Sequence, residues 1–402
     1  MINTQYTAML GQKDIIFEIF HYATARAAEI GTENVFDFSL GNPSVPTPTA
    51  VNNTMIRKLS ALNPLTLHGY SPNKGLPAVR EQLATDLNRK YDCHYTSDHI
   101  FITAGASGAL AHALRAVTNP GDEVITFTPC FPEYYPYAAG AGIHLKTLPA
   151  DTDTFQIPLE LLKKEIGEHT AAVLINTPNN PSGVVYSTET IRRLSKILTE
   201  HARILGHPIF LISDEPYRDI LFDGADSPYV AGFYPDTLTC YSFSKSLSLP
   251  GERIGYLAVN PECAGAETII DICPQISRTI GHNGAAALMQ HTVGDTCGLT
   301  ADLAVYEKNK NLLYKALLSY GYSCVEPSGA FYMFPRSLEP DDEAFCKKAM
   351  ALDLMLVPGS AFGCPGYFRI AYCVPTERVK RSLPIFERLA KEYRDKGNHA
   401  QK

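Results

Sequence analysis

The chain has 402 residues, of which 45% are hydrophobic and 19% charged, a composition typical of a globular protein with a sizeable core. Its 35 Lys and Arg against 42 Asp and Glu give a formal charge of −7, which argues against a nucleic-acid-binding protein. No stretch approaches the roughly 18 uncharged apolar residues of a membrane span, and Met1–Leu10 lacks the features of a secretory signal. We therefore expect a cytoplasmic protein.

The ten cysteines are spread along the chain, and no two of them form a CxxC pair. Their spacing therefore indicates no zinc site, and no metal is expected. In a chain of this length without a secretory signal, we expect reduced thiols, several of them buried as small hydrophobic side chains.

The N-terminal part has a helical pattern over Asp14–Gly31 and then an extended, proline-rich segment over Ser39–Pro48. The middle of the chain alternates short β-branched runs with longer amphipathic ones, which is typical of α/β proteins. One of the amphipathic runs, Ser187–His201, has apolar residues at helical spacing, so one of its faces should pack on the sheet. The predicted strands are Ile100–Ala104, Glu123–Phe127, His144–Leu148, Ala171–Asn176, Pro208–Ser213, Thr237–Phe243 and Gly255–Val259.

The last hundred residues mix helical patterns with the strand-like segments Gly329–Phe334 and Tyr367–Tyr372. We therefore predict a large α/β domain over residues 51–290. Residues 1–50 and 291–402 are predicted to form a smaller domain from both ends of the chain.

Polar clusters follow several predicted strands, at the edge where open α/β sheets bind ligands. In Ile102–Leu110 a strand runs into small residues and a helix, which suits an anion, although tight packing alone also explains such a turn. Asn179 and Asn180 follow a buried strand in the segment NTPNNPSG, which is also compatible with a simple turn. Asp214 and Glu215 end another buried strand, where an acid requires a cationic partner.

Lys245 follows a strand rich in β-branched and aromatic residues, and serines surround it in SFSKSLS. A lysine is ordinarily a solvated surface charge, but among hydroxyls beside a buried strand its amine can act as a nucleophile. Arg369 lies inside an apolar strand, where a guanidinium usually binds a carboxylate or phosphate. With Arg253, the strand-end acid and the phosphate-ready turn, these groups fit a phosphorylated pyridine aldehyde, pyridoxal 5′-phosphate.

The chain resembles the class I and II pyridoxal-phosphate aminotransferases of fold type I, the aspartate aminotransferase superfamily. The resemblance covers nearly the whole chain and rests on the ordered motifs LGNPSVPTP, HGYSPNKGLPAVRE, NTPNNPSG, SDEPY, SFSKSLSLPGERIG and GSAFG…FRIAY. It implies a mostly parallel seven-stranded sheet flanked by helices, a smaller α+β domain and a homodimer with shared active sites. The implied reaction moves an amino group from an amino acid to a 2-oxo acid through a pyridoxamine-phosphate intermediate.

The resemblance also implies roles at the cofactor. Lys245 would form the Schiff base and shuttle the proton at the substrate Cα, and Asp214 would keep the pyridine nitrogen protonated. Tyr217 and Asn180 would hydrogen-bond the O3′ of the ring, and Phe131 would stack on it where relatives often have Trp or Tyr. Many relatives have Gly or a hydroxyl at the position of Ala106, so its phosphate contact would be made by the backbone. The residues implied to hold the phosphate are Ser242, Arg253, Gly105, Ala106 and Ser107.

For the substrate, the resemblance implies that Arg369 binds the α-carboxylate, helped by Asn180 and the backbone of Gly41. Tyr70 would reach the phosphate in the neighbouring subunit's site. Arg278 lies in the region where aspartate-specific relatives place an arginine of the partner subunit, so it is a candidate for the distal carboxylate of the substrate. A structural salt bridge at the surface or interface is the alternative interpretation of Arg278.

Two other functions remain compatible with these residues. The same site could belong to a β-lyase, a cyclopropane-carboxylate synthase or a racemase, because the cofactor performs the hard step. A catalytically silent cofactor-binding dimer module is a remoter alternative, and the presence of Lys245, Asp214 and Arg369 favours an enzyme. We expect acidic or neutral amino donors with 2-oxoglutarate as acceptor.

Overall fold

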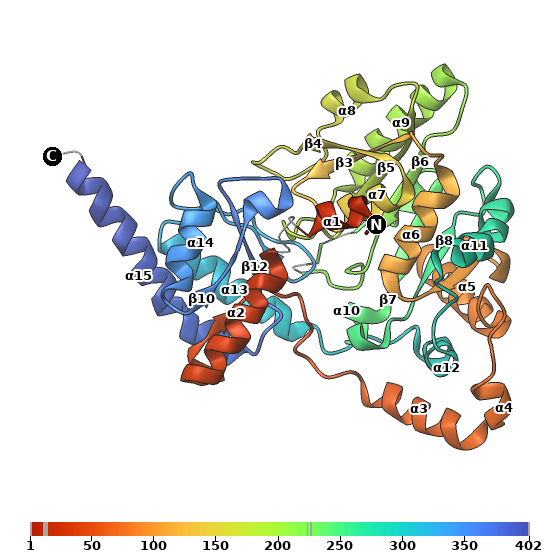
Figure 1. Ribbon diagram of the computed structural model, residues 1–402, viewed down its shortest axis with the longest axis horizontal. Coiled ribbons are helices and arrows are strands. Elements are labelled where there is room, and N and C mark those ends of the chain that lie inside the picture. The colour runs from red at the N-terminus through yellow and green to blue at the C-terminus, as the bar shows by residue number, and fades with distance from the viewer. Residues whose placement is uncertain (1, 11–14, 223, 226, 401–402) are drawn as a thin grey trace. The chain divides into compact units, whose positions relative to one another are not determined.

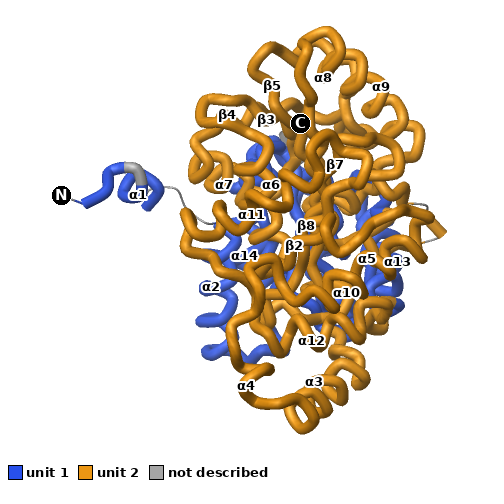
Figure 2. The backbone as a smooth tube through the Cα atoms, turned by 90° about the vertical axis from the view of Figure 1, so that its right-hand side faces the viewer, with its two compact units in different colours: residues 1–44, 304–327, 331–402 blue, residues 45–303, 328–330 orange. Residues whose placement is uncertain are grey.

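The computed structural model describes residues 2–10, 15–222, 224–225 and 227–400, and the chain divides into two compact units (Figure 2). Unit 1 comprises residues 1–44, 304–327 and 331–402, and unit 2 comprises residues 45–303 and 328–330. The expected crossings lie at 50/51 and 290/291, whereas the observed ones lie at 44/45 and 303/304, with a brief return to unit 2 at residues 328–330. The second crossing comes later because α12 (Ala287–Thr296) packs on α3 (Thr49–Ala61) and α5 (Pro77–Tyr91), which belong to unit 2.

Unit 2 contains the main sheet, whose strands match the predicted ones closely. Among the described residues its seven strands are β2 (Ile100–Thr103), β3 (Glu123–Thr128), β4 (His144–Pro149), β5 (Thr170–Asn176), β6 (Phe210–Asp214), β7 (Thr237–Ser242) and β8 (Gly255–Val259). Their order is β2-β8-β7-β6-β5-β3-β4. Strands β3 to β8 are labelled in Figure 1. Strands β3 to β7 are parallel, and β8 is antiparallel to both of its neighbours. The predicted α/β fold with a mostly parallel sheet is therefore confirmed.

Helices cover both faces of this sheet, because successive strand residues point to opposite sides. Val124 belongs to a core shared with α6 (Gly105–Val117), α7 (Tyr134–Ala141) and α11 (Ala266–Ile280). The next residue, Ile125, belongs to a core shared with α8 (Leu159–Glu165) and α9 (Thr188–Leu205). A third core joins α3, α5 and α12 to β2 and β8, and the remaining short helices of unit 2 are α4 (Pro64–Leu67) and α10 (Phe243–Ser246).

The helix predicted over Ser187–His201 is α9. Ser187 caps it, since its side-chain oxygen accepts a hydrogen bond from the Thr190 amide at 3.0 Å. Ile191, Leu194 and Leu198 are buried on the face that packs against the sheet. The helix continues to Leu205, four residues beyond the predicted end, where Gly206 terminates it in the left-handed conformation.

The described part of unit 1 has two small sheets. β1 pairs parallel with β10, and β11, β12 and β9 form an antiparallel sheet. The predicted N-terminal helix corresponds to α2, and Asp14 at its expected start lies outside the described residues. The elements of unit 1 are α1 (Thr4–Met9), α2 (Ile15–Ile30), β1 (Phe36–Asp37), α13 (Ala304–Ser319), β9 (Tyr332–Met333), α14 (Asp342–Met350), β10 (Leu354–Met355), β11 (Val357–Pro358), β12 (Phe368–Ala371) and α15 (Thr376–Ala400).

Candidate active site

Three neighbouring strands of unit 2 end in polar residues. In the sheet register Asn176 of β5 lies beside Asp214 of β6, and Asp214 lies beside Cys240 of β7. β7 ends two residues later at Ser242. Because these strands are parallel, their carboxyl ends meet at one edge, which is where α/β sheets bind ligands.

Asp214 is a buried acid with one carboxylate oxygen left over. Its Oδ2 accepts a hydrogen bond from the Tyr134 hydroxyl at 2.6 Å and from the Asn176 side-chain amide at 3.4 Å. Its Oδ1 is buried and accepts none from the residues the structure describes. Burial raises the pKa of Asp214 to about 7, against the lowering effect of the Tyr134 hydrogen bond. A cationic hydrogen-bond donor at Oδ1 would satisfy this carboxylate.

Asn176 connects two of the predicted site residues. Its side-chain nitrogen donates to the Asp214 carbonyl at 2.8 Å, and its side-chain oxygen accepts from the Asn180 backbone amide at 2.7 Å. Asn180 is thereby held beside the end of β6, and Tyr217 follows Asp214 by three residues and is also buried. Asn176 was not predicted as a site residue, although its place at the end of a buried strand is a usable signal.

Lys245 lies on α10, the single-turn helix that begins directly after β7. Ser242 caps this helix, since its Oγ accepts a hydrogen bond from the Ser244 amide at 3.0 Å. The Lys245 side chain is half-buried, whereas the serines on either side of it, Ser244 and Ser246, are buried. Asp214 therefore ends β6, and Lys245 follows the adjacent parallel strand β7.

The predicted phosphate turn lies at the start of α6. Gly105 has a φ of +76°, and a Cβ at this position would lie 2.9 Å from Nη2 of Arg253. A Cβ at Gly255 would overlap the Tyr241 carbonyl and approach the Gly105 backbone to 2.9 Å. Arg253 therefore lies against the N-terminus of α6, a 13-residue helix, at a position that has no room for a larger side chain than that of glycine. Ser242 lies nearby, because it pairs with Gly255 between β7 and β8. Ala106 and Ser107 belong to the first turn of α6, so the arrangement suits an anion.

Phe131 packs against Tyr134, which contacts Asp214. The two rings are 5.7 Å apart in an edge-to-face arrangement, and the Tyr134 hydroxyl touches Asp214. Tyr134 was not found from the sequence, because nothing local distinguishes it from the other tyrosines of PEYYPY.

Arg369 and Gly41 come together within unit 1. Arg369 is 2% exposed, and its guanidinium donates to the Ser39 carbonyl. It lies over the rings of Tyr332 at 4.9 Å and Phe362 at 4.8 Å. A Cβ at Gly41 would overlap the Tyr332 hydroxyl, so the same tyrosine contacts both predicted residues. Tyr332 was not found from the sequence, because its role depends on long-range contacts.

The structure does not bring Tyr70 and Arg278 to the strand ends. Tyr70 follows α4 and is fully exposed. Arg278 lies exposed near the end of α11, where it donates to the Gln275 side chain at 3.1 Å. Both residues were expected to act at the site of a neighbouring subunit, and their exposure leaves them accessible to one.

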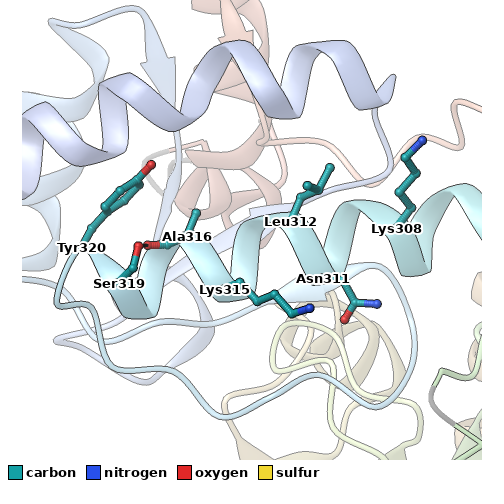
Figure 3. A pocket seen from close by; sticks show the side chains of 7 residues that line it. All are labelled: Lys308, Asn311, Leu312, Lys315, Ala316, Ser319 and Tyr320. Atoms are coloured by element: carbon teal, nitrogen blue, oxygen red, sulfur yellow. Dashed lines mark hydrogen bonds between the residues drawn. The ribbon is translucent and has the colours of Figure 1, made fainter.

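A separate pocket lies along α13 in unit 1 (Figure 3). Its lining residues come from α13 and the residue that follows it, and none of them is a predicted site residue: Lys308, Asn311, Leu312, Lys315, Ala316, Ser319 and Tyr320. In the described part of the chain, no group of three or more His, Cys, Asp or Glu is arranged to hold a metal ion. Within the same residues, no helix is long and apolar enough to cross a membrane.

Comparisons with known proteins agree on one family. The family model for aminotransferases of class I and II matches residues 33–384. A probable aspartate aminotransferase of Methanocaldococcus jannaschii is 31% identical over 385 residues, covering 93% of this chain and 96% of that protein. An amino transferase structure from Eubacterium rectale has a TM-score of 0.94 at 44% identity, covering 98% of this chain and 99% of that one. The aspartate aminotransferase structure of Thermotoga maritima has a TM-score of 0.85 at 28% identity, covering 96% and 99%.

Proposed function

Since this chain belongs to the class I and II aminotransferases, which transfer amino groups with pyridoxal phosphate, we propose that the residues at the ends of β5, β6 and β7 hold that cofactor. The observation that carries the assignment is the buried Oδ1 of Asp214, which accepts no hydrogen bond from the described residues. A protonated pyridine nitrogen is a donor of the required charge. The close approach of the Arg253 guanidinium to Gly105, at the N-terminus of α6, suits a phosphate.

The chain's own residues then have distinct tasks. When bound, the cofactor supplies an aldehyde for the amino group and a ring that stores the electron pair from the substrate Cα. Lys245 anchors the aldehyde and moves the proton at Cα, and Asp214 holds the proton on the ring nitrogen. Asn180 and Tyr217 bind the ring oxygen, and Phe131 stacks on the ring. The phosphate is bound by Ser242, Arg253 and the backbone of Gly105, Ala106 and Ser107.

On the substrate side, Arg369 binds the α-carboxylate with two hydrogen bonds, and the Gly41 backbone adds a third. The burial of Arg369 between Tyr332 and Phe362 supports this role, because a guanidinium held between rings has few orientations. The reaction transfers an amino group from an amino acid to a 2-oxo acid, with acidic or neutral donors.

The active unit in this proposal is a homodimer. Tyr70 reaches the neighbour's phosphate and Arg278 its substrate's distal carboxylate, and the exposure of both side chains supports these roles. The proposed location is the cytoplasm, because all ten cysteines are free and seven of them are buried. Arg278→Ala should lower kcat/KM for aspartate and glutamate about thirtyfold and leave alanine nearly unchanged. An equal loss for all donors would make Arg278 structural.

The proposed function is tested by borohydride reduction of the cofactor-loaded protein followed by peptide mapping. The cofactor should be fixed to Lys245, and Lys245→Ala should lower amino transfer by several orders of magnitude. Lys58→Ala, which removes another half-buried lysine paired with Asp295 at 2.9 Å, should retain activity. Labelling of a different lysine would overturn the assignment.

A half-reaction separates amino transfer from the lyase alternative. An amino donor added alone should yield one equivalent of its 2-oxo acid and leave the amino group on the cofactor. Continuous release of ammonia without an acceptor would instead identify a lyase.

A further inference from the structure

Tyr134 forms a hydrogen bond with Asp214 from within the core of unit 2. It is the first residue of α7 and is 1% exposed. Its hydroxyl donates to Oδ2 of Asp214 at 2.6 Å, a short bond typical of a charged acceptor, across 80 residues of sequence. This hydrogen bond connects α7 to the end of β6, and neither element is a sequence neighbour of the other.

The surrounding core fixes the position of this hydroxyl. The Tyr134 ring belongs to the core between α6, α7 and the sheet, with the Phe131 ring edge-on at 5.7 Å. A side chain packed in this way has one rotamer, so its hydroxyl has one position. On the Asp214 side, the Asn176 amide also approaches Oδ2, at 3.4 Å. Both donors therefore act on one oxygen, and Oδ1 is left for a ligand.

The Tyr134 hydroxyl also opposes the effect of burial on the pKa of Asp214. Burial and the charge of Glu215 raise the pKa of Asp214, whereas the Tyr134 hydrogen bond lowers it. The pKa of the Tyr134 hydroxyl is itself held well above its usual range by burial and by Asp214, so this group is a donor at neutral pH. Without the hydroxyl, Asp214 would keep its proton more readily, and a protonated acid accepts a cationic donor poorly.

We propose that Tyr134 is a positioning residue for amino transfer, because its hydroxyl bonds Oδ2 of Asp214, favours the carboxylate form and leaves Oδ1 available to the cofactor's ring nitrogen. This inference rests on the proposed function and deepens it. Tyr134 acts through Asp214 and needs no contact with the cofactor. The closely following Tyr135 and Tyr137 do not share this role, because the Asp214 hydrogen bond belongs to Tyr134.

The test measures ligand binding to the cofactor-free protein by calorimetry. The probe is 4′-deoxypyridoxine 5′-phosphate, which keeps the ring nitrogen and the phosphate but has no aldehyde for Lys245. Tyr134→Phe should weaken its binding about tenfold, since a hydrogen bond to a charged acceptor is lost. The control, Tyr234→Phe, removes a buried hydroxyl that donates to the Ile209 carbonyl at 2.8 Å, near the opposite end of β6. It should leave the binding unchanged.

A second probe separates positioning from general loosening of the fold. In the analogue of the same compound with CH in place of the ring nitrogen, Tyr134→Phe should cause no loss, because Oδ1 then has no donor to meet. With the natural cofactor, Tyr134→Phe should lower kcat and leave the KM for the amino donor unchanged. Equal losses for both analogues, or a loss matched by Tyr234→Phe, would overturn the inference. Failure of the unmutated protein to bind either probe would overturn the proposed function instead.

Discussion

Asp214 and Glu215 are consecutive buried acids at the end of β6, and they are satisfied in different ways. Both oxygens of Glu215 are used inside the protein, since Oε1 accepts from the Ser213 hydroxyl at 2.7 Å and Oε2 from Arg218 at 3.2 Å. Among the residues that the structure describes, Asp214 has donors on Oδ2 alone. Successive side chains point to opposite sides of a strand, so the two acids meet different surroundings. A fully paired acid supports the fold, and an acid with a spare acceptor can bind a ligand.

The contacts of Arg218, the partner of Glu215, explain why Glu215 has a structural role. Its guanidinium donates to the Tyr256 hydroxyl at 2.9 Å and lies over the Tyr241 ring at 4.2 Å. Tyr241 belongs to β7 and Tyr256 to β8, so this one cation joins the end of β6 to the next two strands. These contacts of Arg218 help to fix the strand ends that carry Asp214 and Ser242.

Removing the Arg218 cation, the partner of Glu215, should have the largest effect on stability. Arg218→Met should lower the free energy of unfolding by about 5 kcal/mol at pH 8, because it leaves Glu215 buried without a counter-ion. Urea denaturation of the cofactor-free protein measures this loss. Adding Glu215→Gln to Arg218→Met should recover part of it, and a double variant as unstable as the single one would contradict the charge-pair explanation.

The contribution of Asp214 to the free energy of unfolding should depend on pH. Its pKa is raised from 3.8 unfolded to about 7 folded, so the stabilisation present below pH 4 is lost as the pH rises to 7. A difference of roughly three pH units corresponds to about 4 kcal/mol. Relative to Asp214→Asn, which cannot ionise, the cofactor-free protein should therefore lose about 4 kcal/mol between pH 4 and pH 8. Bound cofactor should abolish this loss, because a cationic ring favours the ionised acid. A pH-independent difference would show that Asp214 is not a buried titrating group.

The smallest effect is expected at Ser213. Ser213→Ala removes one donor to Glu215 and leaves the Arg218 pair, so the free energy of unfolding should fall by about 1 kcal/mol. The affinity for 4′-deoxypyridoxine 5′-phosphate should not change, since Ser213 does not contact Asp214 through its side chain. A fall in that affinity would mean that the two acids are not independent.

The sequence predicted the parts of the fold that depend on local pattern. The strands β2 to β8 are short buried runs, and α9 carries its own cap and periodicity, so both could be found. The antiparallel placement of β8 between β2 and β7 could not be predicted from local pattern, because strand pairing is decided by long-range contacts. The second crossing lies at 303/304 and not at 290/291 for the same reason, since its position depends on how α12 packs.

The same distinction applies to the candidate site. Lys245 and Asp214 were predicted because a charged residue after a buried strand is unusual, and Arg369 because it lies inside an apolar one. Tyr134 and Tyr332 carry no such signal, since an aromatic residue among others is ordinarily core. Their partners, Asp214 and Gly41, are far away in sequence, so only the folded chain identifies them.

The pairing of β1 with β10 has a consequence for how the protein is made. Phe36 lies opposite Leu354, so the first strand leaves the ribosome 318 residues before its partner exists. At about 5–20 residues per second, this interval is roughly 15–60 s. During that time the apolar Phe36 and Phe38, both buried in the finished protein, have no sheet to join. The nascent chain thus carries an unpaired apolar segment until residues 354–355 have been synthesised.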